Sequence, residues 1–156
     1  MEQFKRYHFI IYFLILPLIC IRCSKDNNNQ ANDLPNADQY ITWNINGEKG
    51  SMTSPNDSIG SARYATDTHI IGQSTTNQNQ FYIIFSGNRD AGTYPVHFAD
   101  LYINQKTYTE SPDPFLVIVT KYGNVDDYII GSYSGKIKDN STNLYPINGN
   151  FKLKTR

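Results

Sequence analysis

The chain has 156 residues, of which 14 are Lys or Arg and 14 are Asp or Glu, so its formal net charge is zero. It has no basic stripe, which argues against a nucleic-acid partner, because phosphate binding depends on clustered Lys and Arg side chains. Its two cysteines, Cys20 and Cys23, both stand near the N-terminus. We therefore expect neither a disulfide nor a cysteine metal site in the rest of the chain.

Residues 1–22 have the pattern of a secretory signal peptide. Lys5 and Arg6 form a basic start, and the fifteen residues 7–21 are almost entirely apolar. As a helix this run would extend about 22 Å, at roughly 1.5 Å per residue, which is short of the ~30 Å hydrocarbon core of a membrane. Pro17 also interrupts it. We therefore expect cleavage rather than a membrane-spanning anchor.

The end of the apolar run resembles the processing site of bacterial lipoproteins, in which the residue after the cut is a cysteine that becomes acylated. Cys23 fits this role, because the polar segment Ser24-Lys25-Asp26 begins directly after it. Arg22 stands where the family usually has a small residue, and Cys20 is the alternative acceptor. The Ser-Lys-Asp start is similar to that of Bacteroidota lipoproteins exported to the cell surface. The resemblance implies a lipid anchor in the outer membrane, with the domain surface-exposed or, alternatively, facing the periplasm.

Residues 23–38 are expected to form a lipid-anchored polar linker. From Ser24 to Asp38 there is one large apolar residue in fifteen, which is too little to offset the entropy of ordering the segment. A flexible coil of this length would hold the following domain on the order of 20 Å from the lipid headgroups. Residues 39–156 are then one domain's worth of chain.

From Tyr40 onward the pattern predicts an antiparallel β-sandwich, with a small β-barrel as the alternative. Short apolar or alternating runs are separated by Gly, Asn, Asp, Ser and Pro every eight to twelve residues, as in all-β domains. The first run, 40–46, puts Ile41, Trp43 and Ile45 on one face. Asn46-Gly47 then predicts a type I′ hairpin into 49–53. Further strands are expected at 61–66, 68–74, 80–86, 93–98, 101–108, 115–122, 128–138 and 145–154.

Two runs, 81–85 and 115–119, are apolar at consecutive positions, which predicts central strands covered on both faces. No window shows the spacing of a helix longer than about two turns, and β-branched residues and tyrosines dominate the apolar runs. The sequence therefore predicts an all-β domain.

Four short patterns are similar to those of small Bacteroidota lipoproteins that consist of one antiparallel β-domain of unassigned function. The patterns are Ile45-Asn46-Gly47, Gly92-Thr93-Tyr94, the run 131–135 (Gly-Ser-Tyr-Ser-Gly) and the run 147–151 (Ile-Asn-Gly-Asn-Phe). The resemblance implies a single antiparallel β-domain and a location in the cell envelope. It carries over no catalytic residues.

The residue patterns that could support chemistry have simpler structural interpretations. His69 and His97 lack the spacing of metal ligands and are expected in surface or structural roles. In 131–135, Tyr133 replaces the serine of a Gly-x-Ser-x-Gly elbow, which favours a strand whose aromatic side chain covers glycine. The acidic loops around Asp57 and Asp127 offer two or three ligands where Ca²⁺ needs six to eight, so they are expected to be turns. We predict no catalytic residue, no metal and no cofactor.

Tyrosine is the unusual component: the chain has twelve, ten of them after the leader. Its flat apolar face and polar tip suit glycan stacking and protein interfaces, although ordinary sheet composition also explains it. The expected exposed binding residues lie near turns: Tyr94, Tyr102, Tyr108, Tyr122 and Tyr128.

These observations predict a non-catalytic binding or structural domain whose partner is a glycan or an envelope protein. The alternatives are an inhibitor or immunity-type lipoprotein that blocks a partner protein and, third, a hydrolase with paired carboxylates. Glycan binding predicts a row of exposed aromatic side chains, a protein partner predicts a compact apolar patch, and an enzyme predicts a pocket with two carboxylates.

Overall fold

The computed structural model describes residues 35–87 and 89–156. The predicted signal peptide, Cys23 and nearly all of the linker lie outside these ranges. The described residues contain strands and turns but no helix, and hence none long and apolar enough to cross a membrane. The ten strands are β1 (Tyr40–Ile45), β2 (Glu48–Thr53), β3 (Ser58–Tyr64), β4 (Asp67–Gln73), β5 (Gln80–Ser86), β6 (Gly92–Ile103), β7 (Lys106–Glu110), β8 (Leu116–Tyr122), β9 (Tyr128–Asp139) and β10 (Leu144–Lys154).

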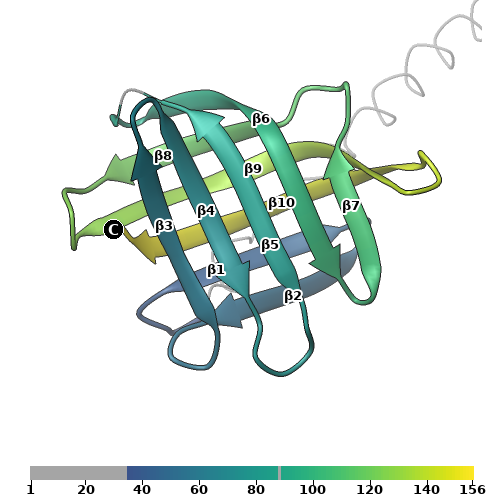
Figure 1. Cartoon of the computed structure of the whole chain (residues 1–156), viewed down its shortest axis with the longest axis horizontal. Helices are drawn as coiled ribbons and strands as arrows, with labels where there is room; N and C mark the ends of the chain where they lie inside the picture. The colour runs from purple at the N-terminus through teal and green to yellow at the C-terminus, as the bar shows by residue number, and fades with distance from the viewer. Residues whose placement is uncertain (1–34, 88) are drawn as a thin grey trace, which may run out of the picture. The chain divides into compact units, whose positions relative to one another are not determined.

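The strands form one antiparallel sheet that folds over on itself into a sandwich, as the sequence predicts. The order is β2-β1-β10-β9-β7-β6-β5-β4-β3, and β8 pairs with both β6 and β9. In Figure 1 the strands β3 to β7 form one layer, which we call the front layer, and they cross the strands β8, β9, β10, β1 and β2 of the back layer at a steep angle. β6 joins the layers, because Gly92–Pro95 pairs with β8 whereas the rest of the strand pairs with β5 and β7.

The core lies between the layers and begins with the predicted face of β1. Ile41, Trp43 and Ile45 are all buried, Trp43 with 4% of its surface exposed. The predicted hairpin follows: Asn46 and Gly47 have φ of 50° and 93°, the positive values of a type I′ turn, and Ile45 pairs with Glu48. The predictions for this first hairpin are therefore confirmed.

The run 131–135 is part of β9, as predicted, and its tyrosine covers a glycine. Tyr133 lies opposite Gly149 of β10 and is wholly buried, which raises the pKa of its phenol well above the usual range. A Cβ atom on Gly149 would lie 2.4 Å from the Tyr133 hydroxyl oxygen. Only glycine lets the ring pass over β10 at this point.

One predicted strand boundary is wrong. The sequence predicts a break between 93–98 and 101–108, but β6 runs without interruption to Ile103 and the chain turns at Asn104-Gln105. Both turn residues have positive φ, 50° and 64°, so this pair adopts the backbone conformation that an Asn-Gly pair signals more plainly. Ala99 is buried and Asp100 exposed, which continues the strand alternation across the predicted break.

The prediction that 81–85 and 115–119 are covered on both faces is also wrong. Phe81, Ile83 and Phe85 are buried, but Tyr82 and Ile84 between them are only half-buried. In β8 the outward Leu116 and Ile118 remain 37% and 43% exposed. A two-layer sandwich covers each strand on one side only, so apolar residues at the outward positions become part of the surface.

Candidate functional site

Four aromatic side chains form a continuous row across the outer surface of the front layer. Tyr64 comes from β3, His69 from β4, Tyr82 from β5 and Phe98 from β6. The ring centroids of Tyr64 and His69 lie 4.4 Å apart, those of His69 and Tyr82 5.5 Å, and those of Tyr82 and Phe98 5.5 Å. Each ring therefore contacts the next, and we call these four residues the aromatic row.

The two ends of the aromatic row are open to solvent, and its two middle rings, His69 and Tyr82, are half-buried. Tyr64 is 58% exposed and Phe98 36%, and the neighbouring Ile71 of β4 is 41% exposed. Beyond Ile71, at the edge of β3, lies a small open cavity of about 110 Å³ lined by Ser58 to Ala62, Ile71 and Arg156. Exposed apolar side chains that are contiguous, rather than scattered, mark interaction surfaces.

Strand alternation explains why these side chains share one face. Ile70 and Ile83 point into the core, so His69 and Tyr82, one residue earlier on each strand, point outward. The pairing of β4 with β5 sets Ile71 opposite Tyr82 and His69 opposite Ile84. The row is thus a direct result of the register between neighbouring strands.

The surroundings of His69 in the row favour its neutral form. Its partial burial lowers the pKa of the imidazole; His97 lowers it further, while Asp67 acts in the opposite direction. The Tyr82 hydroxyl lies 2.7 Å from His69 Nδ1, and in the neutral ring that nitrogen can accept the hydroxyl proton. The contact fixes the orientation of both rings, so the surface offered to a ligand is preorganised.

A polar group of three side chains lies beside the exposed end of the row. Asp67 faces Tyr64 across the β3–β4 pair and Ser86 across the β4–β5 pair. Ser86 Oγ donates a hydrogen bond of 2.8 Å to Asp67 Oδ1. His97 Nδ1 lies 3.4 Å from Ser86 Oγ, and its Nε2 lies 3.9 Å from Asp67 Oδ2. We call Asp67, Ser86 and His97 the polar cluster.

The polar cluster contains the residue types of a hydrolase triad but in a different hydrogen-bond order. In a triad the serine donates to the imidazole and the carboxylate orients that imidazole. Here Ser86 donates to the carboxylate of Asp67, which leaves the serine without a strong base. The arrangement suits hydrogen bonding to a ligand better than nucleophilic attack.

The outer surface of the back layer is different in character. Its central outward positions across β1, β10 and β9 are mainly hydroxyl and amide side chains, lysines occupy outward positions toward the ends of β9 and β10, and exposed apolar side chains occur on β8 and at Leu144 of β10. The polar positions are Thr42, Asn44, Ser132, Ser134, Asn148 and Asn150. Both layers have one solvent-facing surface, so the aromatic row is a property of the front layer and not a general result of the fold.

The five tyrosines expected at exposed positions do not form a common surface. Tyr108 is 3% exposed and belongs to the core, so its expected exposure is wrong; β7 turns it inward against Tyr145. Tyr94 is half-buried and stacks on Phe85. Tyr102 is half-buried as well, on the outer surface of β6 opposite Gln80. Proximity to a turn does not make a tyrosine exposed when its strand position points inward.

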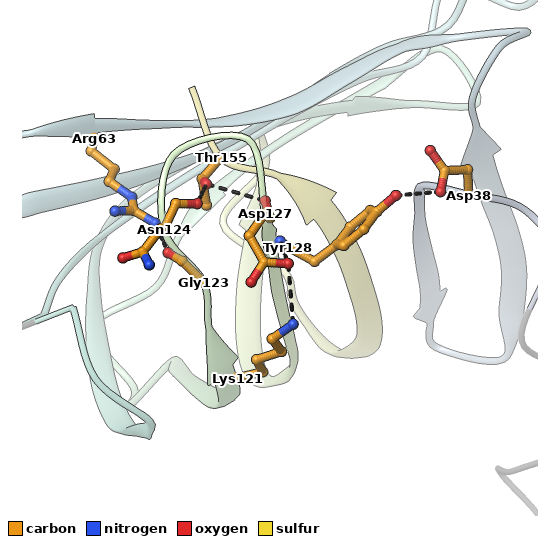
Figure 2. A network of polar contacts seen from close by, with 8 residues as sticks. All are labelled: Asp38, Arg63, Lys121, Gly123, Asn124, Asp127, Tyr128 and Thr155. Carbon is orange, nitrogen blue, oxygen red and sulfur yellow. Dashed lines mark hydrogen bonds and ion pairs between the residues drawn. The ribbon is translucent and has the colours of Figure 1, made fainter.

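Tyr128 belongs to the polar network shown in Figure 2, and Tyr122 contacts Arg63, another residue of that network. The Tyr128 hydroxyl donates to Asp38, and this bond raises the pKa of the phenol. The Tyr122 hydroxyl is hydrogen-bonded to Thr68, and the guanidinium group of Arg63 lies 4.7 Å from the centroid of its ring. Tyr128 therefore fixes the segment before β1 to β9, and Tyr122 links β8 of the back layer to β4 of the front layer.

The two acidic loops are turns, as expected. Asp127 Oδ1 accepts hydrogen bonds from the Tyr128 amide at 2.7 Å and from Lys121 Nζ at 3.1 Å. These contacts lower the pKa of the Asp127 carboxyl, the amide contact most strongly. Asp57 accepts from the Thr53 amide at 2.9 Å. Within residues 35–87 and 89–156 no three His, Cys, Asp or Glu side chains converge as metal ligands.

Sequence reasoning missed Tyr64, Tyr82 and Phe98 as surface residues. The signal was present in the run 81–85, where the outward positions of a strand are as apolar as the inward ones. Such a run indicates either a strand buried on both faces or an exposed apolar surface. Only the number of layers decides between them.

Comparisons with known proteins give no functional information for this chain. No family model matches the sequence, and no curated protein and no solved structure is significantly similar to it. The aromatic row and the polar cluster are therefore the features from which a function can be inferred.

Proposed function

We propose that the chain is a lipid-anchored lipoprotein of the cell envelope whose β-sandwich binds a carbohydrate on the outer surface of the front layer. The observation that carries the proposal is the aromatic row, in which four rings contact one another across four strands and the two end rings, Tyr64 and Phe98, are exposed to solvent. Aromatic rings offer flat apolar surfaces, and these match the C–H faces of sugar rings.

The form of the row favours a carbohydrate over a protein partner. The centres of protein interfaces are compact and depleted of charged residues. Here each strand contributes only one ring, so the row is narrow. Asp67 and Asp100 lie on the same surface, beside Tyr64 and Tyr82.

At the proposed location, such a surface would lie among the glycans of the cell envelope. Cleavage before Cys23 would leave an acylated cysteine, and residues 24–38 would serve as the spacer between lipid and domain. A tethered module gains effective concentration for any glycan of the same surface, so that a weak contact per ring is sufficient for function.

The experiment uses the soluble domain, residues 35–156, which contains the complete core. Binding to insoluble cellulose, xylan, chitin, mannan and starch is measured by co-sedimentation, together with the variants Tyr64→Ala and Tyr82→Ala. We expect binding to at least one polysaccharide, a loss of about tenfold in affinity for each variant, and little change between low and high salt, because no counterions are released.

Ile118→Ala is the matched control, since Ile118 is 43% exposed on the back layer and Ile71 is 41% exposed on the front layer. We expect Ile71→Ala to weaken binding and Ile118→Ala to leave it unchanged. Absence of binding to every polysaccharide, or equal binding by the tyrosine variants and the wild type, would contradict the proposal. Capture of one envelope protein, lost in Tyr82→Ala, would instead indicate the inhibitor-type function.

A further inference from the structure

The polar cluster has hydrogen-bonding capacity that its internal contacts do not use. Asp67 Oδ1 accepts the Ser86 hydroxyl proton, whereas Oδ2 has His97 Nε2 at 3.9 Å, too far for a hydrogen bond. The side chains of Asp67 and His97 are both partly exposed. One carboxylate oxygen and one imidazole nitrogen therefore face solvent side by side.

The cluster lies where a ligand on the aromatic row would reach it. Asp67 is the direct pairing partner of Tyr64 on β3, and Tyr64 is the most exposed ring of the row. A sugar stacked on this ring would present its equatorial hydroxyl groups sideways, toward the neighbouring strand. A carboxylate oxygen and an imidazole nitrogen at adjacent positions match two hydroxyl groups on neighbouring carbons.

We propose that the polar cluster determines specificity by binding a vicinal diol of the sugar that stacks on Tyr64. This inference rests on the proposed carbohydrate-binding function. Asp67 Oδ2 accepts one sugar hydroxyl and His97 Nε2 bonds to the next, while Ser86 keeps the carboxylate oriented through its bond to Oδ1. Hydrogen bonds to an ionised acceptor are roughly twice as strong as neutral ones, so Asp67 makes the larger contribution.

The charges around the polar cluster favour a neutral sugar, whereas Arg156 lies away from the cluster, beside Gly60 and Ile71 in the β3–β4 pair. The outward positions of β4 and β5, all within the described part of the chain, hold Asp67 and no Lys or Arg, and Asp100 lies outward on β6. Arg89, in the loop after β5, donates to the main-chain oxygen of Ala65. A uronic acid polymer would bring further negative charge to Asp67, and like charges in proximity are repulsive.

The test measures two probes by calorimetric titration: a neutral oligosaccharide of the polysaccharide that binds best, and the same oligosaccharide with its hydroxyl groups methylated. Methylation keeps the ring for stacking but removes the donors that Asp67 needs. We expect the wild-type domain to prefer the free oligosaccharide about tenfold. Asp67→Ala should bind both probes with the affinity that the wild-type domain has for the methylated oligosaccharide. His97→Ala should show a preference for the free oligosaccharide that is weaker than that of the wild type but stronger than that of Asp67→Ala.

Asp67→Asn is the conservative variant, since its amide oxygen can still accept the Ser86 proton and preserve the local fold. It should lose most of the preference for the free oligosaccharide, because the ionised acceptor is gone. The matched control is Asp90→Asn in the exposed loop between β5 and β6, which should retain the full preference.

The outcomes separate the two proposals. If Tyr82→Ala weakens binding but Asp67→Ala and Asp67→Asn keep the wild-type preference, the carbohydrate surface stands and the role of the polar cluster is wrong. If the wild-type domain binds a uronic acid polymer more tightly than any neutral glycan, the inference about charge is wrong. If the wild-type domain binds no glycan, both proposals are wrong.

Discussion

The hydroxyl group of Tyr133 donates a hydrogen bond to the main-chain oxygen of Thr42, although β10 separates their two strands. Between Ile41 and Asn44 no β1–β10 pair is formed, and the side chain of Thr42 takes over, with its Oγ1 accepting the Asn150 amide at 3.0 Å. Two side-chain hydroxyl groups thus replace the missing ladder bonds of the back layer.

Gly149→Ala should reduce the free energy of unfolding by about 3 kcal/mol, the upper range for overpacking a core. The new Cβ atom would lie 2.0 Å from the Thr42 oxygen, which is main chain and cannot rotate away. Chemical denaturation followed by circular dichroism measures the change. Gly60→Ala is the control, since its Cβ atom would approach nothing closer than 3.8 Å; equal midpoints for both variants would contradict the packing described for Tyr133.

Tyr133→Phe isolates the hydrogen bond from the packing. The ring would remain in place, but the Thr42 oxygen would lose its donor within the sandwich. Leaving a buried acceptor unpaired costs about 1–3 kcal/mol, so we expect a loss in that range in denaturant titrations. A variant as stable as the wild type would show that the ladder closes without the hydroxyl group.

Trp43→Ala should cost about 3 to 5 kcal/mol of unfolding free energy, a large share of the 5 to 15 kcal/mol typical of a domain. Trp43 is 4% exposed, and an added Cβ atom on Gly50 would lie 2.4 Å from its ring. Leu144→Ala serves as the control, because Leu144 is 48% exposed and should change stability by less than about 0.5 kcal/mol. A loss below about 1 kcal/mol for Trp43→Ala would mean that the ring does not anchor the core.

Stability should decrease as the pH falls from 7.5 to 5.5. The folded domain lowers the pKa of His69 below its usual value of 6.5, chiefly through burial, so in this range the unfolded chain binds the proton more readily. His69→Gln cannot titrate and should flatten the dependence of the denaturation midpoint on pH. The carboxyl groups of Asp38, Asp127 and Asp139 have an ordinary pKa of 3.8, which the folded domain lowers further. They therefore affect stability only below this pH range. If the denaturation midpoint of His69→Gln depended on pH as steeply as that of the wild type, another titrating group would be responsible.

Acylation should depend on Cys23. Cells that express the full chain are labelled with a clickable fatty acid, and Cys23→Ala should lose the label while Cys20→Ala keeps it. The reasoning is that Cys23 alone is followed at once by a hydrophilic segment. Label that is lost only in Cys20→Ala would move the anchor to that residue.

The fold could be predicted from the sequence wherever a single strand or turn carries its own signal. The alternation of Ile41, Trp43 and Ile45 and the Asn46-Gly47 pair are local, and both gave the observed structure. The turn at Asn104-Gln105 was missed because its residues reach positive φ without the glycine that usually marks such a turn.

The aromatic row could not be predicted in the same way, because it depends on four strands in register. Nothing in the sequence near His69 indicates that Tyr64, Tyr82 and Phe98 lie on the same surface; pairing across β3 to β6 brings them together. Likewise, Asp67 and Ser86 are nineteen residues apart and meet only as partners across two strands. Local patterns fix which way a side chain points, and tertiary pairing fixes its neighbours.

The last residues of the chain affect how the domain behaves when many copies are crowded together. The edge of a sheet is a template on which another molecule can add a strand and start an aggregate. At the β3 edge, Thr155 bridges to Ser61, the Arg156 amide donates to the Ser61 oxygen at 3.1 Å, and Ser61 Oγ donates to the Lys154 oxygen. An incoming strand would first have to displace these contacts. The last residue of β10 and the two that follow it therefore protect the β3 edge of the sheet against edge-to-edge polymerisation.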